Sequence, residues 1–252
     1  MIPPVDIRYV AQEFQRLGEE VRRSAEDSQQ SLEPHPEVLI DGLAALLDVL
    51  AAAESSGGID SGSSLRRQMP VEPDGLLTHG LDLLSQLAGQ AARLNQPQAA
   101  KAIEGLALPL ACWMMRLGAE LVHPEPVVNA AAALANRLRE PDDLAALYGL
   151  MSEVVNGISP LRAQEAEEDR RGRTVSRPWR VLLLNRAIVA TRSHRPPLMM
   201  EAFQAVCEHL PEDAPAFFRE GLGQMEALNY PQPVRDLMDR YYSLWCTGQR
   251  LH

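Results

Sequence analysis

Apolar residues recur along this chain at the spacing of an α-helix surface. The clearest case is residues 231–247, where apolar positions fall at i, i+3, i+4, i+7 and i+11: Val234, Leu237, Met238, Tyr241 and Trp245. Residues 5–30 repeat the pattern, at Val10, Phe14, Leu17 and Val21. Because such spacing places apolar side chains on one helix face, the pattern predicts a succession of amphipathic helices.

Prolines followed at once by an acidic residue predict where these helices begin. Proline lacks the backbone N–H that would have no partner in a first helical turn, and an acidic side chain favours the positive end of the helix dipole. Five such pairs begin at Pro36, Pro73, Pro124, Pro141 and Pro211. Pro97 and Pro231, each followed by glutamine, mark two more starts. Pro109 lies inside an apolar run, where it predicts a kink or a division of the helix.

The expected fold is all-α, with antiparallel helical hairpins stacked as an α-solenoid or right-handed helical array of about ten helices. Two helices are expected before residue 55. The others are expected at residues 73–94, 97–121, 124–138, 141–157, 179–192, 196–210, 212–229 and 231–247. Connections this short make neighbouring helices antiparallel, and alanine and leucine, both abundant here, favour helix over strand.

Composition divides the chain into five segments. An N-terminal helical hairpin at 1–54 is followed by a flexible Ser/Gly linker at 55–69 and by helical hairpins at 70–159. Residues 160–178 mix acids with arginines and are expected to form a charged insertion or linker, before C-terminal tandem hairpins at 179–252. The N-terminal hairpin buries too little surface to be comfortably stable alone, so we expect it to pack on the body or on another subunit.

Residues 124–247 resemble the tetratricopeptide-like class of α-solenoids in hairpin size, roughly 35 residues, and in proline punctuation. Trp179 and Leu182 fit the first spacing of that family's pattern, whereas Leu183 and Arg186 replace its glycine and aromatic positions. The resemblance implies a concave surface that captures a peptide or protein segment. No binding residue of the family maps onto this chain.

Net charge, the longest apolar stretch and the placement of the cysteines limit which classes of function we expect for this chain. The net charge is −10, and residues 1–60 hold twelve acids against four arginines, so we do not expect general binding to nucleic-acid phosphates. The longest uncharged apolar stretch, residues 105–115, is too short to span a bilayer, and the first residues lack a signal-peptide pattern. Cys112, Cys207 and Cys246 lie among apolar residues and are expected to be reduced thiols. These features predict a cytoplasmic protein without a membrane partner.

The most unusual polar placement lies in the apolar stretch 181–195. Burying an unpaired amide or guanidinium costs several kcal/mol, so Asn185 and Arg186 must be paired if their helix is surrounded. One interpretation is a groove for an acidic peptide or a carboxylate ligand, with further donors at its mouth. The candidate partner-binding or ligand-binding residues are Asn185, Arg186, Arg192, His194 and Arg195.

Each candidate also has a structural interpretation. Asn136-Arg137 occupies a similar place in an earlier helix, which would make such pairs a mark of each helix's exposed edge. The charged run 165–180 is either a docking tag for an acidic partner or phosphate, or a solvated segment with internal ion pairs. Met199-Met200 is either an adaptable contact surface or core filling.

No catalytic, metal or cofactor motif is recognised in the sequence. The six histidines form no HxxxH pair, and neither a glycine-rich phosphate loop nor a GxSxG serine occurs. The leading hypothesis is therefore a non-enzymatic helical-repeat scaffold or adaptor that binds a peptide or protein segment in a groove. The alternative is an all-helical enzyme or small-ligand sensor with a polar pocket near Asn185, Arg186 and His194. A homo-oligomer would arise if the stripe on the last helix were covered by a second copy.

Overall fold

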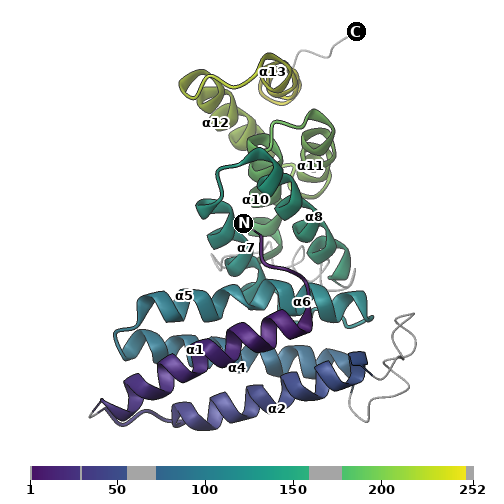
Figure 1. Cartoon of the computed structure of the whole chain (residues 1–252). Coiled ribbons are helices and arrows are strands. Elements are labelled where there is room, and N and C mark those ends of the chain that lie inside the picture. Colours follow the sequence, from purple (N-terminus) through teal and green to yellow (C-terminus); the bar gives the residue numbers. More distant parts are fainter. Residues whose placement is uncertain (1, 29, 56–71, 159–177, 248–252) are drawn as a thin grey trace. The chain divides into compact units, whose positions relative to one another are not determined.

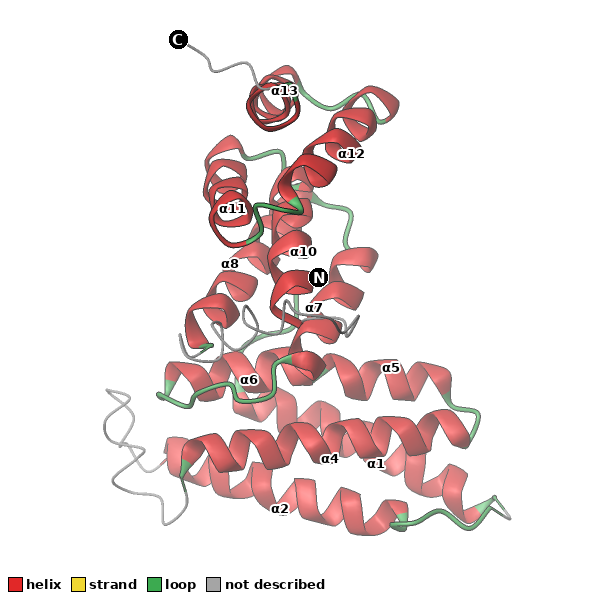
Figure 2. Cartoon of the chain, turned by 180° about the vertical axis from the view of Figure 1, so that it is seen from behind, coloured by secondary structure: helices red, strands yellow, loops and turns green. Residues whose placement is uncertain are grey.

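The computed structural model describes residues 2–28, 30–55, 72–158 and 178–247. Within these ranges every element of regular secondary structure is a helix, so the predicted all-α class is confirmed (Figure 2). The predicted linkers at 55–69 and 160–178 lie outside the described residues, apart from Ser55 and Pro178 at their ends. Among the residues that the structure describes, none of the helices has the length and apolar character that crossing a membrane demands.

The observed helices begin close to the predicted prolines. Pro36, Pro73, Pro97 and Pro141 are each the first helical residue, and the helix predicted from Pro211 begins later, at Ala214. The helices are α1 (Ile7–Glu26), α2 (Pro36–Ser55), α4 (Pro73–Arg93), α5 (Pro97–Gly105), α6 (Ala107–Arg116), α7 (Glu125–Arg137), α8 (Pro141–Gly157), α10 (Pro178–Arg192), α11 (Pro196–His209), α12 (Ala214–Ala227) and α13 (Gln232–Cys246).

Pro109 divides the predicted helix 97–121 into α5 and α6. A proline inside a helix cannot donate to the carbonyl four residues earlier, and its ring clashes with that carbonyl. The carbonyl concerned belongs to Gly105, where α5 ends. The N–H of the next residue, Leu106, bonds to Ile103 at 3.1 Å, in a tighter turn, before α6 resumes at Ala107.

The chain forms two compact units, and the division falls inside α7, after Leu134. The first contains α1, α2, α4, α5, α6 and most of α7. In this N-terminal unit α1 contacts α2, α5 and α6, and α4 contacts α2, α5 and α6, so the rods lie side by side as a bundle (Figures 1 and 2). The N-terminal hairpin at 1–54 thus packs on the helices that follow it, and its core is mostly aliphatic.

The second unit contains the end of α7 together with α8 and α10 to α13. Here α10 pairs with α11 and α12 pairs with α13, and α11 also contacts α13, so two hairpins follow one another (Figure 1). The core of this C-terminal unit contains an aromatic cluster: the Phe203 ring lies edge-on to those of Phe217, Phe218 and Tyr241, at 5.2 to 5.7 Å between centroids. The stripe predicted on the last helix is therefore partly covered within the protomer, with Val234, Leu237 and Met238 buried.

One turn recurs at three helix connections. Asn95, His194 and Asn229 have φ angles of 60°, 56° and 50°, in the left-handed region, and each lies two residues before a proline. In two of them the residue after the left-handed position, Gln96 or Tyr230, donates its N–H to a carbonyl five residues earlier. This is the Schellman pattern, which satisfies carbonyls at the end of a helix, and the proline then begins the next helix.

Candidate functional site

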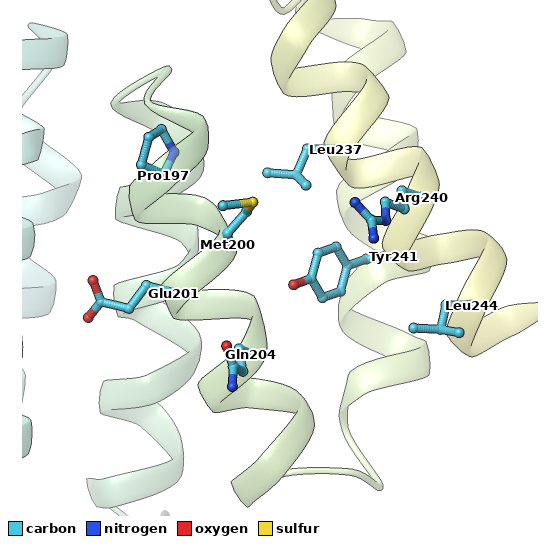
Figure 3. A pocket seen from close by; sticks show the side chains of 8 residues that line it. All are labelled: Pro197, Met200, Glu201, Gln204, Leu237, Arg240, Tyr241 and Leu244. Atoms are coloured by element: carbon cyan, nitrogen blue, oxygen red, sulfur yellow. The ribbon is translucent and has the colours of Figure 1, made fainter. Parts of the chain in front are cut away.

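A groove lies between α11 and α13 in the C-terminal unit (Figure 3). Its volume is about 400 Å³, and we call it the α11/α13 groove. It is lined by Pro197, Met200, Glu201 and Gln204 from α11 and by Leu237, Arg240, Tyr241 and Leu244 from α13. Both helices are the second member of their hairpin, so the groove lies between equivalent elements of two successive hairpins.

The groove combines a fixed base with apolar side chains that remain accessible. Leu237 is buried, and Tyr241 is anchored by its ring contacts with Phe203 and Phe218. Burial raises the pKa of Tyr241 above its ordinary value, because the charged form would be poorly hydrated there. Met200 and Leu244, one on each wall of the groove, are each 48% exposed. They give a ligand apolar surface to cover.

The charges of the groove are distributed unequally between its two walls. Glu201, on α11, forms an ion pair with Arg186, and Figure 3 shows its carboxylate directed away from α13. Arg240, on α13, is exposed and forms no ion pair with any described residue. A segment bound in the groove would therefore meet Arg240 as its main charged contact.

A buried polar cluster holds α8, α10 and α11 together beside the groove. Arg186 is 4% exposed, and its Nε donates to Ser152 Oγ at 2.9 Å while Nη2 donates to Glu201. Its guanidinium carbon lies 4.5 Å from the centroid of the Tyr148 ring, a cation–π geometry. Burial raises the pKa of Tyr148 to about 12, and the nearby positive charge of Arg186 opposes that shift. The cluster therefore fixes the position of Glu201.

Asn185-Arg186 differs in burial from Asn136-Arg137, the similar pair in α7. Asn136 and Arg137 are exposed at the end of α7, whereas Arg186 is buried and Asn185 is half-buried. The guanidinium of Arg186 is engaged by Ser152, Glu201 and the Tyr148 ring, so its contacts are internal.

The remaining predicted residues lie at the connection between α10 and α11. Arg192 donates from Nη1 to the Ala135 carbonyl at 2.7 Å and from Nη2 to the Leu138 carbonyl at 2.6 Å, which caps the end of α7. His194 is the left-handed residue of the turn, and its ring lies edge-on to Tyr230 at 5.1 Å. Arg195 pairs with the exposed Asp142 at 2.6 Å. Arg186, Arg192, His194 and Arg195 thus each contact a different set of residues.

A second, more apolar pocket of about 300 Å³ lies between α10 and α12. We call it the α10/α12 pocket; it is lined by Ile188, Thr191, Arg192, Phe217, Glu220, Gly221, Gln224, Met225, Leu228, Tyr230 and Met238. Gly221 allows α13 to approach, because a Cβ built there would lie 2.7 Å from Met238 Cε. Of the predicted residues, only Arg192 lines this pocket.

Sequence reasoning identified only part of the α11/α13 groove: it offered Met199-Met200 as an adaptable contact surface but did not single out Leu244. Met199 is fully buried and Met200 is 48% exposed, so the two interpretations of Met199-Met200 apply to one residue each. Leu244 falls outside the stripe that runs through Leu237 and Tyr241, and an apolar residue off the stripe is the signal that was available. Across the described ranges, no group of three or more histidine, cysteine, aspartate or glutamate side chains is placed to hold a metal ion.

Comparison with known proteins adds no assignment: no protein-family model, no curated protein and no solved structure matches this chain.

Proposed function

We propose that this protein is a non-enzymatic helical scaffold that binds a segment of a protein partner in the α11/α13 groove. The observation that carries the proposal is the pair of half-exposed apolar side chains, Met200 and Leu244, set over a fixed aromatic base. Exposed apolar side chains around a groove are typical of surfaces that another molecule covers. The proposal includes a cytoplasmic setting, as cysteine usage suggests.

The shape of the groove favours a helical segment. Two neighbouring helices that leave an apolar channel between them fit the apolar face of a third, which then presents anchors at i, i+3, i+4 and i+7. Met200 and Leu244 would contact those anchors, and Gln204 and Arg240 would provide a polar rim. The resemblance to tetratricopeptide-like solenoids supports the same use, because it implies peptide capture on the surface formed by successive hairpins.

The test is affinity selection of a displayed random-peptide library on the folded chain, followed by fluorescence anisotropy with the selected peptides. Met200→Glu and Leu244→Glu place a charge against the apolar face of the ligand, so each is expected to weaken binding by about tenfold or more. Leu228→Glu is the matched control, since Leu228 is 61% exposed on the loop side of α12, outside this groove. The proposal would be contradicted if the selected peptides bound both groove variants as tightly as the original chain. A selection that yielded no binding peptide would contradict it too.

The α10/α12 pocket supports a second candidate, a sensor for a small apolar ligand. Ile188 and Leu228 are 43% and 61% exposed at the pocket, and Thr191 and Tyr230 supply polar atoms among apolar walls. A few polar groups in an apolar pocket are the usual composition of small-molecule sites. This candidate keeps Arg192 at the site but leaves out Asn185 and Arg186.

A thermal-shift screen of metabolites distinguishes the two candidates. A ligand that binds the native state raises the melting midpoint, and the rise grows with the logarithm of its concentration once that exceeds Kd. If the sensor hypothesis holds, a small apolar metabolite raises the midpoint, and Leu228→Glu abolishes the shift while Leu244→Glu leaves it intact. If no metabolite raises the midpoint, the peptide-binding scaffold remains the stronger candidate.

A further inference from the structure

The N-terminal unit carries another groove, between α1 and α2, which the proposed function does not use. Its volume is about 480 Å³. Its lining includes the buried Phe14, Ile40 and Leu47, with the half-buried Ala11 and Ala44 beside them. Apolar side chains thus form its base, and charged ones stand along its edges.

Carboxylates and exposed valines continue this surface around α2. Helical spacing places Glu37, Asp41 and Asp48 in one line next to the groove, and Val38 and Val49 beyond that line. Val38 is 63% exposed and Val49 is 56% exposed, and they share one face because they are eleven residues apart. We call this continuous surface, made of the groove, the carboxylate line and the two valines, the α1/α2 face.

The charge of the α1/α2 face is not balanced from within. Its two basic groove residues are already paired: Arg8 lies 3.4 Å from Glu54, and Arg22 lies 2.8 Å from Glu19 and 3.4 Å from Asp41. Glu37 and Asp48 form no ion pair with any described residue. Residues 1–60 hold twelve acids against four arginines, and such an excess attracts positively charged partners.

We infer that the α1/α2 face binds a basic amphipathic helical segment of a partner protein. Apolar residues of that segment enter the groove, and its lysines or arginines lie over Glu37 and Asp48, beside the two valines. A second copy of this chain would bring carboxylates against carboxylates, which is costly when the surfaces meet. Phosphate-bearing partners, nucleic acids and anionic membranes are disfavoured by the same charge.

The inference is tested with two fluorescent synthetic helical peptides that share the same leucine positions and carry either lysine or glutamate between them. The lysine peptide is expected to bind the full chain at least about tenfold more tightly, and to lose most of that affinity between about 50 and 300 mM salt. A scrambled lysine peptide of identical composition controls for charge alone, because it has no apolar face.

Variants locate the binding surface. Glu37→Lys with Asp48→Lys should weaken lysine-peptide binding about tenfold and improve glutamate-peptide binding. The matched control reverses two carboxylates in the other unit, Glu212→Lys with Asp239→Lys, and should change affinity less than about twofold because neither residue belongs to the α1/α2 face. Circular dichroism confirms that each variant is folded.

The contradicting outcomes are equally specific. The inference fails if the lysine peptide binds no better than its scrambled form, or if both double variants weaken it alike. It also fails if sedimentation shows a dimer that Val38→Glu with Val49→Glu dissociates, because a second copy then covers the face. Met200→Glu and Leu244→Glu leave lysine-peptide binding unchanged, which separates this inference from the proposed function.

Discussion

The two units reach their cores by different means. The N-terminal unit spreads its buried surface over many leucines and alanines on α2, α4, α5 and α6, with Phe14 as its one phenylalanine. The C-terminal unit holds the other three phenylalanines and also buries Arg186. Both cores contain many aliphatic side chains, but only in the second unit do phenylalanine rings pack against one another. A substitution within that ring cluster is therefore expected to have a larger effect than the loss of one leucine from the first unit.

The largest expected effect comes from Phe203→Ala. Phe203 is fully buried and touches three aromatic rings, so its removal should cost about 4 kcal/mol of unfolding free energy. Urea unfolding followed by Trp245 fluorescence, in a variant whose other tryptophans are replaced, measures it. Leu84→Ala, read from Trp113 in the same way, should cost less because leucine has fewer buried atoms to lose and makes no ring contacts. Equal losses would erase the contrast between the units.

Arg186→Ala should have the next largest effect, a loss of about 2 kcal/mol of unfolding free energy. It removes a buried guanidinium and leaves a cavity against Tyr148 and Ser152. Arg186→Met fills most of the same volume without a charge and should cost less than about 1 kcal/mol, because Glu201, whose side chain is 60% exposed, remains hydrated without its partner. Chemical denaturation of the two variants, side by side, measures both losses of unfolding free energy. If methionine is as harmful as alanine, the charge itself stabilises the unit.

Alkaline pH provides a third test, directed at the buried Tyr148 of the C-terminal unit. The pKa of Tyr148 is raised by burial from 10.0 to about 12, so the unfolded chain loses this proton before the folded chain does. Its contribution to stability is therefore complete below pH 10 and declines as the pH rises toward 12. The unfolding midpoint should fall over this range, and Tyr148→Phe should reduce the fall. A fall unaffected by Tyr148→Phe would assign it to other groups.

The smallest expected effect separates two glycines on α12. Gly221→Ala places a methyl group 2.7 Å from Met238 Cε, and shifting this buried methionine should cost about 1 kcal/mol. Gly223→Ala meets nothing within 4 Å and should instead stabilise the helix by about 0.5–1 kcal/mol. Thermal melts of both variants show whether each substitution raises or lowers the stability. A stabilising Gly221→Ala would mean that α13 moves away from α12 at little cost.

Local signals in the sequence were sufficient for the positions of the helices. The helix starts at Pro36, Pro73, Pro97 and Pro141 and the break before Pro109 depend on backbone geometry within a few residues, which a single sequence displays. The assembly of the hairpins depends on which helix faces pack together. The sequence predicted this only as a general architecture, without the pairs of faces. The stacking of all hairpins into one solenoid remains a prediction.

The candidate sites were harder to predict because they depend on contacts between distant residues. The partners of Arg186 lie 15 residues ahead at Glu201 and 34 residues behind at Ser152. Whether a methionine is core or surface depends on the neighbouring helix, as the contrast between Met199 and Met200 shows. Likewise, apolar spacing on α2 indicated a helix but did not show that Val38 would be left uncovered.

The left-handed turn at Asn95, His194 and Asn229 has a consequence for the order of folding. Each turn is specified by three consecutive residues that end in proline, and it brings together helices that are adjacent in sequence. Contacts between near neighbours in the chain close with little loss of entropy and form early. The hairpins α4–α5, α10–α11 and α12–α13 should therefore assemble as separate nuclei before the units consolidate.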